Sequence, residues 1–550
     1  MKNDKKLKRY TLFLLFSLWL STIIAQPKYE VRAVWLTTLG GLDWPKNYAH
    51  DGMGIERQKE DLIRILDQLK AINVNTVLFQ TRVRATAAYP SDLEPWEGSF
   101  SGVPGKTPGY DPLQFAIDEC HRRGMELHAW VVVIPIGKWN TTGCKWVRKW
   151  YPSLVKRIGD EGYMNPEAYG TADYIANICE EITTRYDIDG IHLDYIRYPE
   201  TWRGKMYHEN ITRIVRKVNE RVKKHKPWVK MSCSPIGKSG DLSRYRSNGW
   251  NAYSRVKQDA QGWLRDGLMD QLYPMMYFSG NNFYPFALDW QEQSNGRTIV
   301  SGLGTYMLHP HERNWSLSEV KRQLSVTRQI GIGHCHFRTK FLLDNVKGIY
   351  DYMLQNDRHP ALIPPMKWAQ SLAPTAPKQL KVERTSIGDN LSWSGAIDRS
   401  DGPYLLYNIY ASTTEPVDIT KAENLIATRR SEQQLSIRRN SHQRPLYYAV
   451  TALDRYGNES APIYSDTKKK IAAVETGLLP NNGKLLTIPQ RNLFDADLLV
   501  VCDMQGRTVK TFFNRPQINI SLLPEGMYQL KSMHKKGHSH RLGFFSIKRK

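Results

Sequence analysis

Short apolar segments alternate with helical patterns from residue 30 to about residue 355. Each apolar segment has the length of a strand, and the stretches between them, such as 57–71 and 206–224, place aliphatic side chains on one helical face. Strands that alternate with helices form a parallel sheet with helical crossovers. The strand count favours a closed (β/α)8 barrel over an open sheet. The expected strands are residues 31–37, 76–82, 126–133, 190–196, 230–235, 271–277, 299–306 and 334–338.

The texture of the chain changes twice after the predicted barrel. A chain of 550 residues is too long for one hydrophobic core. Residues 28–358 are expected to form the barrel, and a proline-rich linker follows at 359–376. Segments with short strands and turns follow at 377–470 and 475–550. The predicted fold class is therefore α/β, a (β/α)8 TIM barrel followed by two small all-β sandwich domains.

The first 25 residues have the order of a secretory signal peptide. Basic residues precede an apolar stretch at 12–20 that is too short to span a bilayer, and small residues lead to Ala25. We therefore expect an exported protein, located in the periplasm, at the outer cell surface or outside the cell. Because export separates the chain from the chromosome, nucleic acid is not an expected partner.

The chain is strongly basic, with a formal net charge of +23. An exported basic protein suits an anionic partner, such as the cell-envelope surface or an acidic polysaccharide. A solvated basic surface without a specific partner explains the charge equally well.

The cysteines favour neither a disulfide framework nor a metal site. Four of them fall within helical or strand patterns and are expected to be buried small side chains, and the other two lie in different predicted domains. Metal-like spacing occurs at His334 and His336, but no third ligand is visible there. No metal and no cofactor is therefore predicted. The cysteines are Cys120, Cys179, Cys233 and Cys335 in the first group, and Cys144 and Cys502 in the second.

The fourth expected strand carries charge where apolar side chains are typical. Its sequence is DGIHLDYIRYP, residues 189–199. Side chains alternate along a strand, so His192, Asp194 and Ile196 would share one face and residues 191, 193 and 195 the other. Burying an unpaired carboxylate is costly, so Asp194 is expected at the open end of the barrel, where it meets substrate. A structural ion pair with Arg197 is the alternative.

Aromatic and polar side chains also end several other strands, where active sites of such barrels gather. Sugar rings present apolar faces that stack on aromatic rings and hydroxyl groups that need polar partners, so this mixture indicates a carbohydrate. Trp44 and Trp130 are the expected stacking platforms. Each expected contact could instead support the site from behind. The expected substrate contacts are Trp44, Arg82, His128, Trp130, Arg197, Tyr273 and Tyr277.

Four sets of motifs are spread over most of the predicted barrel. They are VRAVWLT at 31–37 with GLDWP at 41–45, YPS at 89–91 with EPW at 94–96, the segment at 189–199, and QLYPMMY at 271–277. Together they resemble the glycosyl hydrolase-like 10 family of bacterial (β/α)8 proteins. The resemblance implies glycoside hydrolysis, with bacterial cell-wall or related glycans, possibly peptidoglycan, as substrates.

The fourth-strand motif is also similar to the chitinase signature D-G-x-D-x-D-x-E. Ile196 stands where that family has its acidic proton donor, and His192 stands where it has the first inner aspartate. A mechanism in which the acetamide group of the substrate attacks therefore does not carry over. Asp194 is retained, and an acid must come from another loop.

Glycoside hydrolysis usually needs two carboxylates, one on each side of the scissile bond. We expect Asp194 and Glu94 to be this pair, because Glu94 follows the second strand in a segment that could arch over the barrel mouth. Asp43 and Glu312, in loops after the first and seventh strands, are the reserve candidates. The alternative is a non-catalytic glycan-binding surface protein, for which Asp194 alone would suffice.

The two C-terminal segments resemble accessory modules. Residues 377–470 resemble a fibronectin type III sandwich, which implies a spacer or glycan-presenting role. Residues 475–550 resemble the C-terminal β-sandwich that directs proteins through the type IX secretion route, which implies contact with export machinery. A plain β domain that stabilises the chain is the alternative for the second segment.

Overall fold

The computed structural model describes residues 26–243, 245, 249–385, 387–438, 446–465, 479–488, 497–533 and 539–548. The predicted signal peptide at 1–25 lies outside the described residues. Residue contacts divide the chain into two compact units, Met1–Ser465 and Asp466–Lys550. Within the described part of the chain, none of the helices has the length and apolar character needed to cross a membrane.

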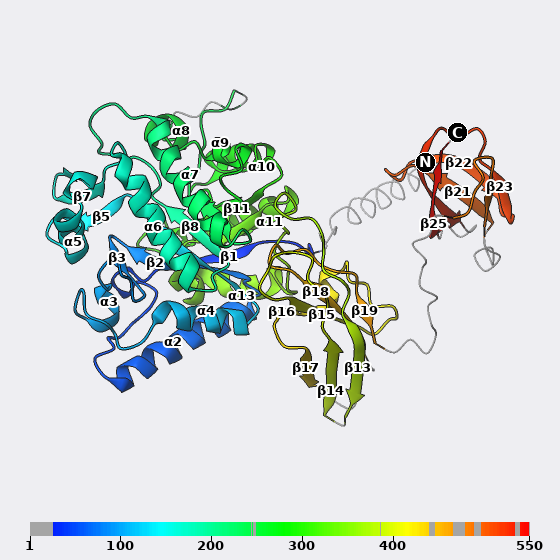
Figure 1. Ribbon diagram of the computed structural model, residues 1–550, viewed down its shortest axis with the longest axis horizontal. Helices are drawn as coiled ribbons and strands as arrows, with labels where there is room; N and C mark the ends of the chain where they lie inside the picture. Colours follow the sequence, from blue (N-terminus) through cyan, green and yellow to red (C-terminus); the bar gives the residue numbers. More distant parts are fainter. Residues whose placement is uncertain are drawn as a thin grey trace, which may run out of the picture. The chain divides into compact units, whose positions relative to one another are not determined.

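Eight parallel strands close into a barrel in the first unit, as the sequence predicted (Figure 1). Each strand pairs with its neighbours in the order β1-β12-β11-β10-β9-β8-β4-β2, and β2 pairs back onto β1. All eight expected strands are present, with ends that shift by a few residues. The strands are β1 (Arg32–Leu36), β2 (Thr76–Val83), β4 (Glu126–Val132), β8 (Gly190–Asp194), β9 (Lys230–Cys233), β10 (Gln271–Leu272), β11 (Thr298–Leu303) and β12 (Gly333–His336).

Helices surround the barrel because one face of each is apolar. In α2, Leu62, Leu66 and Leu69 are buried against the strands, and the helix begins earlier than expected because Asp51 caps it by accepting a hydrogen bond from the Gly54 N–H. The other helices of this layer are α4 (Pro112–Arg122), α6 (Tyr169–Arg185), α7 (His208–His225), α8 (Ala252–Val256), α9 (Ala260–Arg265), α10 (Tyr284–Glu292), α11 (Leu317–Gln329), α12 (Thr339–Leu343) and α13 (Ile349–Asn356).

Long insertions follow the second and third barrel strands. After β2, the short strand β3 (Thr86–Ala87) turns back along it, and α3 (Gly98–Ser101) follows. After β4, residues 135–164 form an antiparallel sheet in the order β5-β7-β6, with a helix between β5 and β6. Figure 1 shows this insertion at the end of the barrel away from the sandwich. Its elements are β5 (Pro135–Lys138), α5 (Thr142–Trp150), β6 (Val155–Ile158) and β7 (Glu161–Met164).

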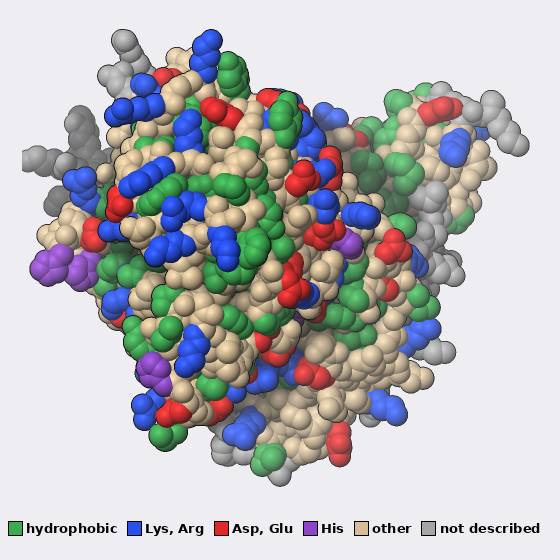
Figure 2. Space-filling model, turned by 60° about the vertical axis from the view of Figure 1, so that its left-hand side comes forward, with side chains coloured by type: hydrophobic (Ala, Val, Ile, Leu, Met, Phe, Trp, Pro, Cys, Tyr) green, Lys and Arg blue, Asp and Glu red, His purple; other side chains and the backbone are tan. Residues whose placement is uncertain are grey.

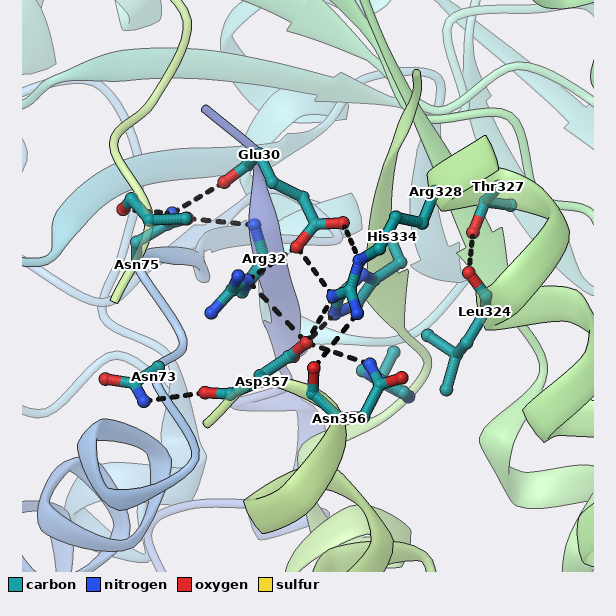
Figure 3. Close-up of polar contacts among 12 residues, drawn as sticks. Glu30, Arg32, Asn73, Asn75, Leu324, Thr327, Arg328, His334, Asn356 and Asp357 are labelled. Atoms are coloured by element: carbon teal, nitrogen blue, oxygen red, sulfur yellow. Dashed lines mark hydrogen bonds and ion pairs between the residues drawn. The ribbon is translucent and has the colours of Figure 1, made fainter. Parts of the chain in front are cut away.

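A buried network of charges lies at the amino ends of β1 and β12 (Figure 3). Arg32 donates to Glu30 at 2.7 Å, Arg328 donates to Asp357 at 2.6 Å, and His334 lies 3.2 Å from Asp357. Burial raises the pKa of the Asp357 carboxyl, but Arg32 and His334 outweigh burial and hold that pKa well below its usual range. These charges therefore stabilise the base of the barrel through mutual pairing.

Two antiparallel sheets with a shared hydrophobic core, called the sandwich below, cover another part of the barrel base. The sheets have the orders β13-β14-β17 and β16-β15-β18-β19. The connection from the barrel runs beside the start of the described chain, where Glu30 and Leu362 are joined by a backbone hydrogen bond of 2.9 Å. The strands are β13 (Lys378–Arg384), β14 (Gly388–Ser394), β15 (Leu406–Ser412), β16 (Leu425–Arg430), β17 (Gln434–Arg438), β18 (Tyr447–Leu453) and β19 (Ile463–Tyr464).

Two arginines of the sandwich insert into the barrel base. Arg429 donates to Glu126 at 2.8 Å and to Asp189 at 2.6 Å, and Arg455 lies 3.3 Å from Asp189. Lys230 adds a contact of 2.7 Å to Glu126. Because all of these side chains are buried, each charge depends on its partners across the two parts of the unit.

The boundary between barrel and sandwich has no spare room at Gly124, which follows α4. Its φ of +70° is in the left-handed region, and a Cβ there would lie 2.2 Å from the carbonyl oxygen of Thr428. Only glycine allows the two backbones to approach this closely. The sandwich is thus packed directly onto the barrel.

The C-terminal unit is a separate small β structure. Its sheets have the orders β22-β21-β24-β25 and β20-β23, and Leu499, Leu530 and Phe545 lie in its core. Its strands are β20 (Leu485–Thr487), β21 (Leu498–Cys502), β22 (Thr508–Phe513), β23 (Gln517–Asn519), β24 (Gly526–Met533) and β25 (Ser539–Ile547). All six cysteines of the chain are buried, as expected for Cys120, Cys179, Cys233 and Cys335.

Candidate active site

A cavity of about 620 Å³ opens at the carboxyl ends of the barrel strands. Residues from the ends of β1, β2, β4, β8, β10 and β12 line it, together with residues of the β5-β7-β6 insertion. This is where a (β/α)8 barrel places its functional groups. The lining residues are Thr37, Leu39, Leu42, Gln80, Val83, Arg84, Trp130, Val132, Pro135, Glu161, Tyr163, Asp194, Tyr195, Glu200, Met275, Tyr277, Phe337 and Arg338.

Asp194 is the last residue of β8 and lines the cavity. Its Oδ1 accepts hydrogen bonds from Ser234 Oγ at 2.7 Å and from the Tyr195 N–H at 2.8 Å. Its Oδ2 accepts one from Trp130 Nε1 at 3.1 Å. Three neutral donors on three segments fix the orientation of this carboxylate, and no ion pair to it occurs among the described residues.

The strand alternation expected after Asp194 is wrong. Tyr195 has a φ of +51°, so the chain leaves the extended conformation there. Tyr195 therefore faces the cavity, and Ile196 packs into the layer between strands and helices. A side chain at position 196 therefore could not reach a substrate to donate a proton. This agrees with the presence of Ile196 where the chitinase signature has its acidic residue.

Arg197 does not pair with Asp194. Its guanidinium lies 3.8 Å from the centre of the Tyr195 ring and 3.2 Å from Glu200. The side chain is buried, and its Nε and Nη1 have no hydrogen-bond partner among the described residues. Arg197 therefore contacts two residues that line the cavity, Tyr195 and Glu200, and does not itself line it.

Two of the expected aromatic contacts reach the cavity. Trp130 and Tyr277 line it, and the Tyr277 ring stacks on Phe337 at a centroid distance of 5.3 Å. Tyr273 lies deeper, fully buried, where its hydroxyl donates to Gln271. Tyr273 is therefore part of the barrel core and not a substrate contact.

His128 also points into the closed part of the barrel. Its Nε2 lies 3.1 Å from Glu126, and it packs against Gly190, where a Cβ would come within 2.6 Å of the ring. Nearby, burial lowers the pKa of His192 well below its usual value, so this imidazole is neutral. The expected role of His128 as a substrate contact is not supported, because it lies below the cavity.

Glu94 and Arg82 form a hydrogen-bonded ion pair in the protein interior. Arg82 Nη2 donates to Glu94 Oε1 at 2.6 Å and Arg82 Nε donates to Oε2 at 2.8 Å. Tyr174 donates to the same Oε1 at 2.9 Å. Neither Glu94 nor Arg82 lines the cavity. Both oxygens of Glu94 are therefore occupied, and the expected catalytic role of Glu94 and substrate contact by Arg82 have no support in this geometry.

The remaining expected residues also lie outside the cavity. Asp43 locks the loop after β1: it accepts from Thr37 Oγ1 at 2.6 Å and from Arg338 at 2.5 Å. Trp44 is fully buried and packs on Phe79 and Phe100 instead of forming a stacking platform (5.9 and 5.4 Å between ring centres). Glu312 is exposed in the loop after β11 and does not line the cavity.

The sequence did not predict Glu161, Tyr163 and Glu200 as cavity residues. Glu161 and Tyr163 alternate on one face of β7, which is a detectable signal. Nothing in the sequence shows that β7 folds back over the barrel mouth. Glu161 makes no ion pair among the described residues, whereas Glu200 contacts Arg197. Glu161 is therefore the unpaired carboxylate that shares the cavity with Asp194.

Metal-like spacing in β12 has a structural explanation. His334 pairs with Asp357, and His336 Nδ1 lies 2.7 Å from Thr305 Oγ1. Burial lowers the pKa of His336 to about 3. Across the described residues, no group of three His, Cys, Asp or Glu side chains is arranged to hold a metal ion.

Comparison with known proteins supports the family resemblance. Residues 30–209 and 200–303 match the model of a family described as glycosyl hydrolase-like 10. Glycosyl hydrolase YngK of Bacillus subtilis is 31% identical over 491 residues, which cover 81% of this chain and 94% of that protein. Glycosyl hydrolase DigH of Escherichia coli is 31% identical over 292 residues, 46% of this chain and 66% of that protein.

A solved structure is also similar in part. The glycoside hydrolase domain of PgaB from Bordetella bronchiseptica aligns with 59% of this chain and 99% of that domain. The identity is 11% and the TM-score is 0.42, which is too low to relate the two sites.

Proposed function

The chain belongs to the glycosyl hydrolase-like 10 family, and on that premise we propose that it is a glycoside hydrolase acting on a bacterial polysaccharide. The observation that carries the proposal is an oriented carboxylate, Asp194, in a large open cavity that also holds the unpaired carboxylate Glu161. Peptidoglycan glycan strands are the first substrate to test.

We assign the two-carboxylate mechanism to Asp194 and Glu161. One protonated carboxyl assists the leaving oxygen, and the other acts as base or nucleophile. Glu161 replaces Glu94 in this pair because Glu94 is tied to Arg82 on both oxygens. Glu200 is the weaker candidate, since it already contacts Arg197. The sites of acid and base within the pair stay unassigned.

The cavity walls suit a sugar ring. Aromatic side chains from separate strands offer faces for stacking, namely Trp130, Tyr163, Tyr195 and Tyr277. Gln80 and Arg84 supply polar groups toward hydroxyls. Binding of a neutral ring by stacking and of its rim by hydrogen bonds is how such a mixed pocket fixes orientation.

The other parts of the chain support an exported enzyme. The basic and then apolar order of residues 1–25 is the basis for proposing export to the periplasm, the cell surface or the medium. The sheets β13-β14-β17 and β16-β15-β18-β19 support a fibronectin type III-like sandwich. We further propose that the C-terminal unit is a sorting domain that contacts export machinery, and that the basic surface favours an anionic envelope.

The test is release of sugar fragments from purified peptidoglycan and from peptide-stripped glycan strands, with products identified by mass spectrometry. Asp194→Asn and Glu161→Gln should each lower release by about 10²- to 10⁴-fold, the usual contribution of a positioned acid or base. Glu94→Gln is the matched control, because it removes a buried carboxylate outside the cavity.

Release that survives in Glu161→Gln but is lost in folded Glu94→Gln would reverse the assignment. Binding of glycan by the wild type without any release from either substrate would instead favour a non-catalytic glycan-binding protein.

A further inference from the structure

The helix α5 exposes two tryptophans on one face. Trp146 and Trp150 are one turn apart, with ring centres separated by 5.9 Å, and are 37% and 55% exposed. Lys145 and Lys149, also one turn apart, are exposed beside them. The opposite face of α5 is buried through Gly143, Cys144 and Val147. Burial of this opposite face therefore does not account for the exposed parts of the two rings.

Neighbouring groups hold the tryptophans in place. Trp146 Nε1 donates to the carbonyl oxygen of Leu93 at 2.8 Å, which fixes the plane of the ring. The ammonium group of Lys149 lies 4.7 Å from the centre of the Trp150 ring. Such rings lose little conformational entropy when they bind a ligand. They form a prepared aromatic surface.

This surface belongs to the insertion that builds one wall of the cavity. The strand β7 of the same insertion supplies Glu161 and Tyr163 to the cavity. The first turn of α5 packs on the chain at Arg84, where a Cβ on Gly143 would lie 2.4 Å from the Arg84 carbonyl oxygen. Arg84 also lines the cavity. The tryptophans are thus carried by the cavity wall.

Charge in this insertion has one dominant sign. Residues 135–164 contain the acidic Asp160 and Glu161, against a larger set of basic residues. Figure 2 shows Lys and Arg side chains beside hydrophobic ones on the face that it turns forward. The basic residues are Lys138, Lys145, Arg148, Lys149, Lys156 and Arg157. A ligand with negative charge complements such a surface.

We propose that Trp146 and Trp150, with Lys145 and Lys149, bind the part of an anionic polysaccharide chain that extends beyond the cavity. Sugar rings stack on the indoles, and the ammonium groups attract acidic substituents of the same chain. The identity of this polymer as the substrate rests on the proposed function, but its binding at α5 does not require that the bond be cleaved.

Binding is tested with the full chain carrying Asp194→Asn, so that hydrolysis does not remove the polymer. Added Trp146→Ala and Trp150→Ala substitutions should weaken co-sedimentation with purified peptidoglycan about tenfold, or about 1.4 kcal/mol, because both stacking contacts are lost. Phe513→Ala is the control for an exposed aromatic ring, because Phe513 is 75% exposed in the C-terminal unit.

The charge contribution is tested separately. Lys145→Gln with Lys149→Gln should weaken binding and reduce its dependence on salt. The control Lys378→Gln with Lys381→Gln removes two exposed lysines of the sandwich and should leave binding unchanged. Neutral cellulose should bind more weakly than peptidoglycan.

In the wild-type background, the tryptophan variant should retain its hydrolysis of short soluble oligosaccharides that fit the cavity. Its hydrolysis of the polymer, at a polymer concentration below saturation, should fall by up to about tenfold. If the wild type binds the polymer through the tryptophans but cleaves no glycan, this inference is upheld and only the proposed function is overturned.

Three results would overturn this inference. They are failure of the wild type to bind peptidoglycan, undiminished binding by the tryptophan variant, and tryptophan-dependent binding to anionic phospholipid vesicles in place of polysaccharide. The last result would assign the surface to a membrane.

Discussion

Acidic side chains lie at both ends of the barrel, but not all of them have a charged partner. At the amino end, Glu126, Asp189 and Asp357 each contact at least one Arg, Lys or His. At the carboxyl end, Asp43 and Glu94 are likewise paired, with Arg338 and Arg82. The carboxylates that line the cavity differ: Asp194 accepts hydrogen bonds from neutral donors only, and Glu161 has no ion pair among the described residues. A buried carboxylate is therefore no guide to a site by itself. What matters is whether its charge is already compensated.

The strand β4 shows the same contrast within seven residues. Glu126, His128 and Trp130 share its inner face. Glu126 and His128 pair with each other near the base, whereas Trp130 reaches the cavity and donates to Asp194. Each step of two residues moves a side chain by about 6.6 Å along the strand. Position along a strand thus separates structural from functional groups.

The largest expected effect is on the amino end. Arg429→Met should lower the free energy of unfolding by about 3–5 kcal/mol, because Glu126 and Asp189 each lose a buried partner. Activity per folded molecule should stay unchanged, since the cavity is at the other end. Urea unfolding and activity assays on the same samples measure both quantities.

Arg438→Met is the matched control for this change, because Arg438 is exposed on β17. Equal stability of the two variants would mean that the sandwich does not stabilise the barrel base.

The next largest expected effect is a loss of stability at acid pH, through Glu126 at the amino end of the barrel. Burial raises the pKa of Glu126, but Lys230 and Arg429 outweigh burial and lower it to about 2 from its usual 4.5. A carboxyl with a lowered folded-state pKa contributes stability that is complete above pH 4.5 and is lost as the pH falls toward 2. The free energy of unfolding should therefore decline across that window.

The comparison for this titration is Glu126→Gln, which has no carboxyl to protonate at this position. Its unfolding free energy should fall less steeply between pH 4.5 and pH 2. Parallel curves for the two proteins would remove Glu126 from the explanation.

The smallest expected effect is at the carboxyl end. Trp130→Phe removes one of the hydrogen bonds that orient Asp194 and keeps an aromatic ring in the cavity. Loss of about 1–1.5 kcal/mol of positioning corresponds to about a tenfold fall in kcat. Steady-state kinetics together with thermal unfolding measure the result. A kcat equal to that of the wild type would show that the remaining donors suffice.

Local patterns predicted the barrel because each strand and helix carries its own periodicity. The strand ends were less certain: the expected strand at 271–277 is paired only at β10 (Gln271–Leu272). Asp194, Trp130 and Tyr277 were correctly expected at the mouth because strand ends face that side.

The expected site residues that do not reach the cavity are held elsewhere by contacts that the sequence does not show. Glu94 lies in the loop after the second strand, which was expected to arch over the barrel mouth. Its hydrogen-bonded ion pair with Arg82 instead holds it in the interior. Trp44 reads as a loop residue, yet its ring turns into the core. Glu161 was missed because it belongs to an insertion whose return to the mouth depends on tertiary packing.

Arg429 and Arg455 lie far after the last barrel strand, which ends at His336. During synthesis, all eight strands therefore emerge before the arginines that neutralise Glu126 and Asp189 exist. Until the sandwich has been made, Glu126 and Asp189 at the barrel base therefore lack their arginine partners. The charge pairs at the barrel base are thus complete only after a later part of the chain has been made. A chain terminated before residue 429 would leave Glu126 with Lys230, and Asp189 with His121, as charged partners.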